Sequence, residues 1–247
     1  MATPIVHDRW DQYLTFASDK PLFVSFDVDA TEQDLSYQFP YCARVIVPVK
    51  QPNQNGGPTG AESERLYGME DQLCEVLGQA NVMCRLVGRL THNGTREIVF
   101  QLANFDAFRP PVGWWMQQNR DYQIEVSEHD GWEFFNETIR PTATDWLWMQ
   151  DRDVVDNLLK AGSNPDRPHD IDFTFCGAAD GLKRAAAQLA KRGYTASGPL
   201  NFADGSFTAV KRLPLDLEAI HAESLANYEL AATFGIEFDG WGAMVVE

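Results

Sequence analysis

The pattern of strand and helix segments restarts once along the chain, and this restart limits the fold to two similar units. In each half, β-rich and amphipathic segments follow the order strand, helix, strand, strand, helix, strand, with one extra element in front. That order is typical of ferredoxin-like domains. Residues 136–145 carry little hydrophobic periodicity, so we place the domain boundary there. The sequence predicts an α+β protein of two ferredoxin-like domains with antiparallel sheets, residues 1–144 and 145–247.

The strands of the first half are marked by β-branched and aromatic residues between polar or Pro-containing segments. We expect strands at 21–28, 41–49, 82–90, 95–102 and 122–126. Asn93-Gly94 lies between the third and fourth of these, and this dipeptide favours the positive φ angles of a tight turn. The pair 82–90 and 95–102 is therefore predicted to form a β-hairpin.

Two helices are expected in the first half, one starting at 59–62 and one within 104–118. Thr59 and Glu62 have the spacing of a capping box, and Gly78 is expected to end that helix. Pro110 and Pro111 are expected to lie in the first turn of the second helix or to divide it, because proline removes a hydrogen-bond donor.

The second half repeats the alternation of helices and strands. The expected elements are a helix at 151–160, a strand at 170–175, a helix at 180–192, strands at 194–200 and 206–212, a helix at 214–234 and a strand at 243–246. Asp151 is typical of a helix start, and Gly235 of a helix end. Asp204-Gly205 predicts a second tight hairpin turn.

The two halves end on similar segments. Residues 128–132 (EHDGW) match residues 237–241 (EFDGW) at four of five positions. The match is consistent with an ancient duplication. The alternative is that Asp-Gly-Trp is a recurrent bulge or turn followed by a packing tryptophan.

The net charge of −16 and the isoelectric point near 4.6 argue against direct nucleic-acid binding, because a negative surface repels phosphates. Both halves are acidic: 11 Lys and Arg stand against 20 Asp and Glu in residues 1–144, and 9 stand against 16 in residues 145–247. This charge favours a basic protein partner, and the alternative is that it serves solubility alone. The N-terminal segment lacks the apolar core of a signal peptide, and no apolar run is long enough to span a membrane, so we expect a cytoplasmic protein.

The chain offers no recognisable catalytic or metal-binding pattern. Nucleophile-elbow, phosphate-loop and dinucleotide-binding motifs are absent from the sequence, and its five histidines are scattered. The four cysteines form no Cys-x-x-Cys pair and are expected to be small buried residues. Two acidic groupings are more typical of solvated loops than of calcium or magnesium sites; they are Asp27, Asp29, Glu32 and Asp34, and His169, Asp170 and Asp172. We therefore predict no catalytic residue, no metal and no cofactor.

Large apolar side chains crowd near the domain boundary, at residues 114–116 (WWM) and 146–149 (WLWM). One interpretation is that they bury the contact between the domains. The other is that they form a partner-binding surface, because aromatic residues and methionine are enriched at interfaces.

The second half resembles the type B regulators of ribonuclease E activity (RraB). The likeness covers about 145–247 and is carried by four segments: 151–159 (DRDVVDNLL), 161–165 (AGSNP), Gly193-Tyr194 and 237–241 (EFDGW). The family usually has Tyr where Phe238 stands. The first half resembles an uncharacterised domain family often fused to this one, through residues 70–73, 88–91 and 94–97. No activity is implied by that part.

The RraB resemblance implies a non-enzymatic, ferredoxin-like regulator that binds the scaffold region of ribonuclease E and alters RNA decay. An acidic regulator would compete with RNA for an Arg-rich segment. The interaction residues that we select are Glu237, Asp239, Gly240, Trp241, Asp130 and Trp132. The alternative is an enzyme or a metal- or small-ligand-binding protein that uses the cleft between the domains. The sequence leaves the client protein, the oligomeric state and the role of the first domain open.

Overall fold

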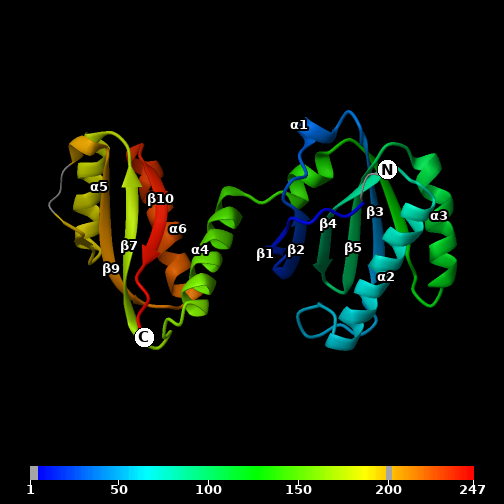
Figure 1. Cartoon of the computed structure of the whole chain (residues 1–247), viewed down its shortest axis with the longest axis horizontal. Helices are drawn as coiled ribbons and strands as arrows, with labels where there is room; N and C mark the ends of the chain where they lie inside the picture. Colours follow the sequence, from blue (N-terminus) through cyan, green and yellow to red (C-terminus); the bar gives the residue numbers. More distant parts are fainter. Residues whose placement is uncertain (1–4, 199–201) are drawn as a thin grey trace. The chain divides into compact units, whose positions relative to one another are not determined.

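The computed structural model of the chain describes residues 5–198 and 202–247. It divides into two compact units, Met1–Pro141 (unit 1) and Thr142–Glu247 (unit 2). Each unit combines helices with an antiparallel sheet (Figure 1). The predicted α+β class with two antiparallel sheets is therefore confirmed.

Unit 1 contains a sheet of order β1-β2-β4-β5-β3-β6, in which each pairing of neighbours is antiparallel. Its strands are β1 (Trp10–Ala17), β2 (Lys20–Asp27), β3 (Tyr41–Pro48), β4 (Cys84–His92), β5 (Thr95–Leu102) and β6 (Glu125–Asp130). Its helices are α1 (Glu32–Leu35), α2 (Gly60–Gln79), α3 (Phe105–Gln118) and the π-helix η1 (Phe135–Ile139).

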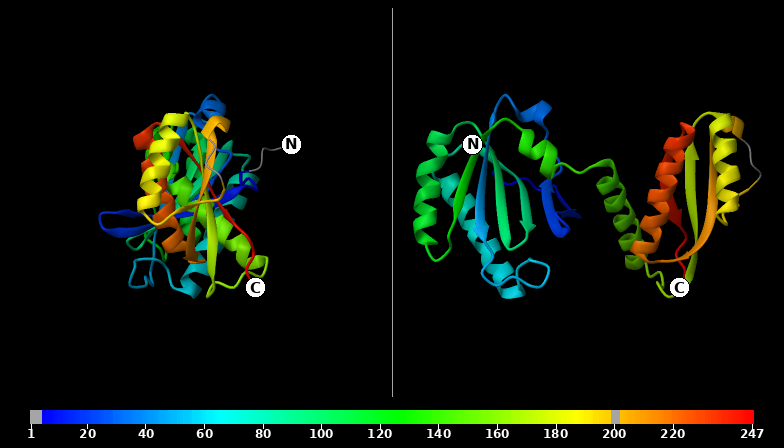
Figure 2. Two further views of the ribbon diagram at one scale, coloured as in Figure 1. Left: turned by 90° about the vertical axis from the view of Figure 1, so that its left-hand side faces the viewer. Right: turned by 180° about the vertical axis from the view of Figure 1, so that it is seen from behind.

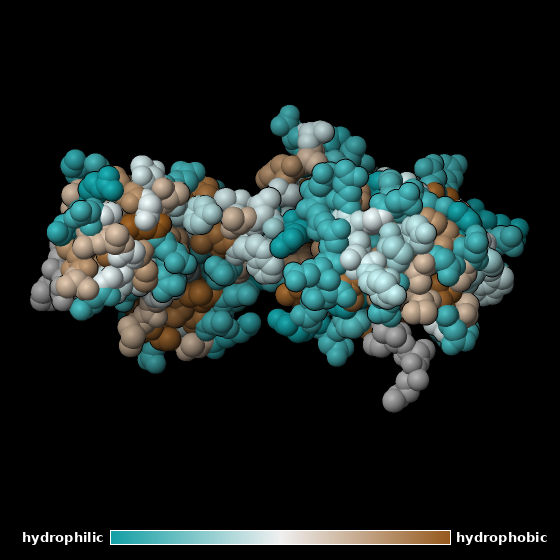
Figure 3. All heavy atoms as spheres, turned by 90° about the horizontal axis from the view of Figure 1, so that it is seen from above, coloured by the Kyte–Doolittle hydropathy of each residue, from teal (hydrophilic) through white to brown (hydrophobic). Residues whose placement is uncertain are grey.

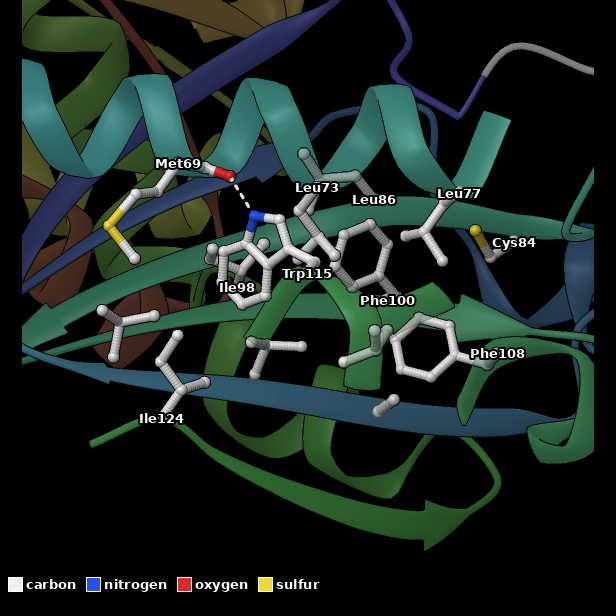
Figure 4. Packing of buried hydrophobic residues seen from close by; sticks show 14 of the residues in the cluster. Met69, Leu73, Leu77, Cys84, Leu86, Ile98, Phe100, Phe108, Trp115 and Ile124 are labelled. Atoms are coloured by element: carbon white, nitrogen blue, oxygen red, sulfur yellow. Dashed lines mark hydrogen bonds between the residues drawn. The ribbon is translucent and has the colours of Figure 1, made fainter. Parts of the chain in front are cut away.

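Helices α2 and α3 cover one face of this sheet and enclose its main core (Figures 1 and 4). Trp115 of α3 is fully buried, and its indole Nε1 donates to the Met69 carbonyl of α2 at 3.1 Å. Phe100 of β5 packs on Phe108 with ring centroids 5.7 Å apart. The hydrogen bond from the Trp115 indole and the continuous apolar packing thus hold both helices on the sheet.

The predicted hairpin at Asn93-Gly94 is confirmed, with φ angles of 47° and 83°. The predicted capping box is wrong, because the Thr59 side chain makes no capping hydrogen bond. The Glu62 carboxylate instead accepts the backbone N–H of Lys50 at 2.9 Å. Helix α2 also runs past Gly78 to Gln79, and the left-handed residue that follows is Asn81, with φ 52°.

The expectation for the proline pair is also wrong, because α3 is continuous and carries Pro110 and Pro111 inside it. In a helix without proline, the backbone N–H groups at positions 110 and 111 would donate to the carbonyls of two exposed residues in the first turn. Water can donate to these carbonyls instead. Buried Phe108 and Trp115 hold the helix across this gap. The last strand starts at Glu125 rather than at residue 122.

Unit 2 contains a sheet of order β10-β7-β9-β8, antiparallel throughout the described residues. Its elements are α4 (Ala143–Lys160), β7 (Pro168–Cys176), α5 (Ala179–Lys191), β8 (Thr195–Ala196), the 3-10 helix η2 (Phe202–Asp204), β9 (Ser206–Pro214), α6 (Leu217–Phe234) and β10 (Glu237–Ala243). The alternation predicted for β7 is confirmed, because Ile171, Phe173 and Phe175 are fully buried. Helices α5 and α6 lie beside the strands and pack on these side chains (Figures 1 and 2).

The first helix of unit 2 starts earlier than predicted. Helix α4 begins at Ala143, where Thr142 and Asp145 form a reciprocal capping box, so Asp151 lies inside the helix. The signals at its end, Lys160 and Gly162 with φ 95°, are confirmed.

The tight hairpin predicted at Asp204-Gly205 is wrong. Strand β8 spans two residues that pair with Ala209 and Val210, and Gly205 follows the short helix η2. Residues 199–201, which include the end of the strand predicted at 194–200, lie outside the described residues. The closing strand is also misplaced: β10 spans Glu237–Ala243 instead of residues 243–246. The helix end at Gly235 is confirmed, with φ 63°.

Candidate functional site

Strand β10 lies at an edge of the unit 2 sheet as far as the described residues show, and it holds four of the six predicted interaction residues. Phe238 pairs with Phe175, and Trp241 pairs with Phe173. Asp239 and Gly240 therefore stand opposite a single residue of β7, which is the geometry of a β-bulge. Gly240 has φ 94°, a conformation that glycine adopts without strain. The bulge keeps the Trp241 side chain on the helix-covered face.

Trp241 reaches a buried carboxylate on α4. Its indole Nε1 donates to Asp151 Oδ1 at 2.6 Å, and Ser224 Oγ of α6 donates to the same oxygen at 3.0 Å. His221 Nδ1 of α6 lies 2.8 Å from Asp151 Oδ2. Asp151 is 1% exposed. Burial raises the pKa of Asp151, and the three hydrogen bonds oppose that shift only in part. One carboxylate therefore ties α4, α6 and β10 together.

The Ser, His and Asp side chains of this network are not arranged as a catalytic triad. In a triad, histidine bridges the serine and the carboxylate. Here Ser224 and His221 each contact Asp151 directly, and Ser224 is fully buried. The geometry stabilises the domain and sets the orientation of Trp241.

A second polar cluster lies on the neighbouring part of α6. Glu223 accepts from Tyr194 Oη at 2.6 Å, from Lys211 Nζ and from Arg192 Nη2 at 3.4 Å. Burial would raise the pKa of Glu223, but Lys211, Tyr194 and Arg192 together lower it. Two of the basic side chains of unit 2, Arg192 and Lys211, thus share one half-buried carboxylate.

The opposite face of the unit 2 sheet is polar, and its side chains are exposed or half-buried. We call the acidic face the group Asp170, Asp172, Glu237 and Asp239, of which Asp172 is half-buried and the others are exposed. Glu237 pairs across the ladder with Cys176. Burial raises the pKa of the Cys176 thiol, and the charges of Asp239 and Glu237 raise it further. The negative charges of both carboxylates are therefore felt at the same place on this face. Figure 3 shows hydrophilic residues over much of the visible surface, with hydrophobic patches between them.

The other two predicted residues lie in unit 1 and differ in exposure. Asp130 is the exposed last residue of β6. Trp132 is 2% exposed, and its indole Nε1 donates to the Phe39 carbonyl at 2.9 Å. Gly131, with φ 74°, turns the chain from the strand into the segment before η1. In this structure Trp132 is a core residue, and it presents almost no surface to a partner.

The acidic grouping after the first strands is occupied by internal partners. Asp27 is fully buried and pairs with Arg85 at 2.6 Å, and Asp29 pairs with Arg9 at 2.7 Å. In unit 2, His169 is buried and contacts Ser163 Oγ at 3.0 Å. Within residues 5–198 and 202–247, no group of three or more His, Cys, Asp or Glu side chains is arranged to hold a metal ion.

The cysteines are free; Cys42 and Cys84 are buried as predicted, whereas Cys74 and Cys176 are only half-buried. Burial raises the pKa of the Cys42 and Cys84 thiols to about 12, so they are poor nucleophiles at neutral pH. In the part of the chain that the structure describes, no helix combines the length and apolar character needed to cross a membrane.

Sequence comparison divides the chain at the same region as the fold. Residues 8–139 match a family of unknown function, DUF695, and residues 148–243 match the family Regulator of ribonuclease activity B, RraB. Among curated proteins, a Regulator of ribonuclease activity B from Aeromonas salmonicida (strain A449) is 35% identical over 101 residues, which are 38% of this chain and 88% of the relative. The protein of the same name from Aeromonas hydrophila is 34% identical over 38% of this chain and 88% of the relative. That from Pseudoalteromonas atlantica is 31% identical over 40% of this chain and 92% of the relative. The chain therefore belongs to the DUF695 family through its first unit and to the Regulator of ribonuclease activity B family through its second.

Proposed function

We propose that the protein is a non-enzymatic adaptor that binds a ribonuclease through unit 2 and modulates RNA decay, with ribonuclease E as the partner. The observation that carries the proposal is the match of unit 2 to nearly the whole length of relatives named as regulators of ribonuclease activity. The Asp151 network supports the non-enzymatic role, because its serine and carboxylate are buried and bonded to each other.

The proposed contact surface is the acidic face together with the bulge at Asp239-Gly240. A basic, RNA-binding segment of the ribonuclease would meet four carboxylates there, and Arg212 lies 3.9 Å from only one of them, Asp170. Residues 145–247 carry 16 acidic and 9 basic residues. This negative net charge adds a long-range attraction for such a segment and a repulsion for RNA. Trp241 follows the bulge on the helix-covered face of the sheet, where its hydrogen bond to Asp151 fixes the position of the strand.

We further propose that both units are ferredoxin-like and derive from one ancestral domain. Strands β7, β8, β9 and β10 have the sheet order β10-β7-β9-β8, and strands β3, β4, β5 and β6 have the equivalent order β6-β3-β5-β4. Unit 1 differs by the hairpin β1-β2, which extends its sheet beyond β4. Unit 1 is proposed to modify which client the protein serves.

The function is tested with purified full-length chain, ribonuclease E that includes its scaffold region, and a labelled RNA substrate. The expected result is a stable complex and slower cleavage of the RNA, with no cleavage by the chain alone. Absence of a complex, or cleavage of RNA by the chain itself, would contradict the proposal. The alternative, a metal or ligand held between the domains, stays a prediction.

A further inference from the structure

Unit 1 contains a hollow on the helix-covered face of its sheet, where the hairpin β1-β2 extends past α2. Ser25 of β2 stands directly opposite Arg89 of β4, and Phe23 stands opposite Thr91. These side chains, Arg96 of β5, and Ser63 and Tyr67 of α2 line a hollow of about 270 Å³. We call this hollow the Arg96 pocket.

Arg96 is buried in this pocket without a full set of partners. Only 4% of its surface is exposed. Its Nε donates to Thr91 Oγ1 at 3.2 Å, and its guanidinium lies 4.6 Å from the centre of the Tyr67 ring. Among the residues that the structure describes, no hydrogen-bond acceptor meets Arg96 Nη1, although that atom is buried. A buried guanidinium donor without an acceptor costs free energy, and an acceptor from outside the chain would recover it.

The neighbouring Arg89, in contrast, has a carboxylate partner. Arg89 donates through Nε to Glu70 Oε2 at 2.7 Å and through Nη2 to Glu70 Oε1, and Glu70 is 4% exposed. Burial would lower the pKa of Arg89, but the Glu70 pair raises it. For Arg96, burial lowers the pKa and the charge of Arg89 adds to this shift, while Tyr67 and Glu70 oppose it only in part. The two guanidinium groups and the buried Glu70 carboxylate together leave one positive charge in the pocket, and the exposed Asp71 acts on Arg89 from outside it.

This positive charge stands out against its surroundings. Residues 1–144 carry 20 Asp and Glu against 11 Lys and Arg, so the domain as a whole repels anions. The overall charge of unit 1 therefore cannot attract an anion, and any anion that binds must be held by local groups such as those of the Arg96 pocket.

We propose that the Arg96 pocket binds the carboxylate or phosphate group of a small organic molecule. Arg96 Nη1 donates to the oxyanion, because guanidinium geometry matches both groups. Ser25 and Ser63 add hydroxyl groups to the lining. Phe23 and Tyr67 are each 43% exposed and offer ring surface to the organic part of the ligand. The volume of about 270 Å³ suits a small metabolite and is below that of most sites for drug-sized ligands.

The proposal is tested on the full chain by calorimetric titration and thermal melting with four probes: inorganic phosphate, phenyl phosphate, benzoate and phenol. We expect at least one of the anions to bind saturably at one site and to raise the melting temperature, and phenol to bind at least tenfold more weakly than phenyl phosphate. The stronger binder of phenyl phosphate and benzoate identifies the oxyanion, and either order supports the proposal. Absence of binding by all three anions, or binding of phenol as tight as that of phenyl phosphate, overturns it.

Arg96→Met keeps the apolar stem on the Tyr67 ring and removes the charge. We expect it to lose anion binding at least tenfold while the protein without ligand melts at an unchanged or higher temperature. The matched control is Arg109→Met on α3, where the arginine is exposed and pairs with Glu128 at 2.6 Å; anion binding should stay within twofold. If Arg96→Met fails to fold, Ser25→Leu decides, because it fills the pocket and leaves Arg96 in place. Wild-type affinity in the folded pocket variant overturns the proposal.

Discussion

Trp241 of β10 donates its indole hydrogen bond to Asp151 of α4, 90 positions earlier in the chain, at 2.6 Å. The bond joins the bulged edge strand to the first helix of unit 2. The position of the surface bulge therefore depends on the buried carboxylate.

Asp151→Asn is expected to lower the free energy of unfolding by about 1–3 kcal/mol, because an amide NH₂ replaces an acceptor that faces donors. The effect depends on pH. The folded-state pKa of Asp151 is raised above its ordinary value, so the charged form is disfavoured by folding, and wild-type stability rises as pH falls through the folded pKa toward the ordinary value. Urea unfolding of both proteins between about pH 4 and 7 should show the wild-type gaining relative to the variant at low pH. A difference that is independent of pH would contradict the buried position of the carboxylate.

Trp241→Phe removes the donor and keeps most of the ring. We expect a loss of about 1–2 kcal/mol and a cooperative melt, because Asp151 retains Ser224 and His221. Trp241→Ala removes the packing as well and should cost about 3–5 kcal/mol. Equal costs for the two variants would show that the hydrogen bond carries the whole contribution of this side chain, against this prediction.

Gly88→Ala in β4 should destabilise unit 1 by about 1–3 kcal/mol, because an added Cβ would lie 2.7 Å from Ile139 Cδ1. The close contact lies between β4 and η1, on the face opposite α2. Ile139→Ala in the same chain should remove most of the penalty of the alanine at 88, which a double-mutant cycle measures.

The matched control is Gly113→Ala in α3, where nothing in the described structure lies within 4 Å of an added Cβ. Alanine there should raise stability by about 0.5–1 kcal/mol through helix propensity. A neutral Gly88→Ala would argue that η1 does not pack on β4 as the structure has it.

Unit 2 is expected to fold on its own as residues 142–247. A fragment that starts at 145 lacks Thr142, whose Oγ1 accepts from the Asp145 backbone, and should be less stable by about 0.5–2 kcal/mol. Thermal melting with two independent probes compares the fragments. A molten, noncooperative product from 142–247 would contradict the autonomy of the unit.

Local signals predicted the elements where one residue type decides the backbone. Asn93-Gly94 defines a hairpin, and Gly235 ends a helix, because their positive φ angles depend on local sterics. The same reasoning failed where packing decides. Buried Phe108 and Trp115 keep α3 continuous through two prolines. The start of α4 is a different case, because a local signal was missed: the capping box of Thr142 and Asp145 begins the helix eight residues before the predicted start.

The functional side chains were harder to predict, because long-range contacts assemble them. Asp151 reads as an ordinary helix-start acid, and only the fold brings Trp241 and Ser224 to it. His221 and Ser224 one turn apart on α6 were the available local signal for that network. Arg96 has no distinguishing sequence context, since its missing partner is a property of the assembled pocket.

The most direct test of the central claim is the association rate between the full chain and ribonuclease E at about 0.05 and 0.5 M salt, where the Debye length falls from about 14 Å to about 4 Å. The rate should fall clearly with salt for wild-type protein. The variant Glu237→Gln with Asp239→Asn should associate more slowly at low salt and depend less on salt. The control, Glu229→Gln with Asp156→Asn, changes the same charges at exposed positions of α6 and α4 and should follow the wild-type. A rate that is unaffected by salt and by the acidic-face variant, or tight binding of RNA by the chain, would contradict the account.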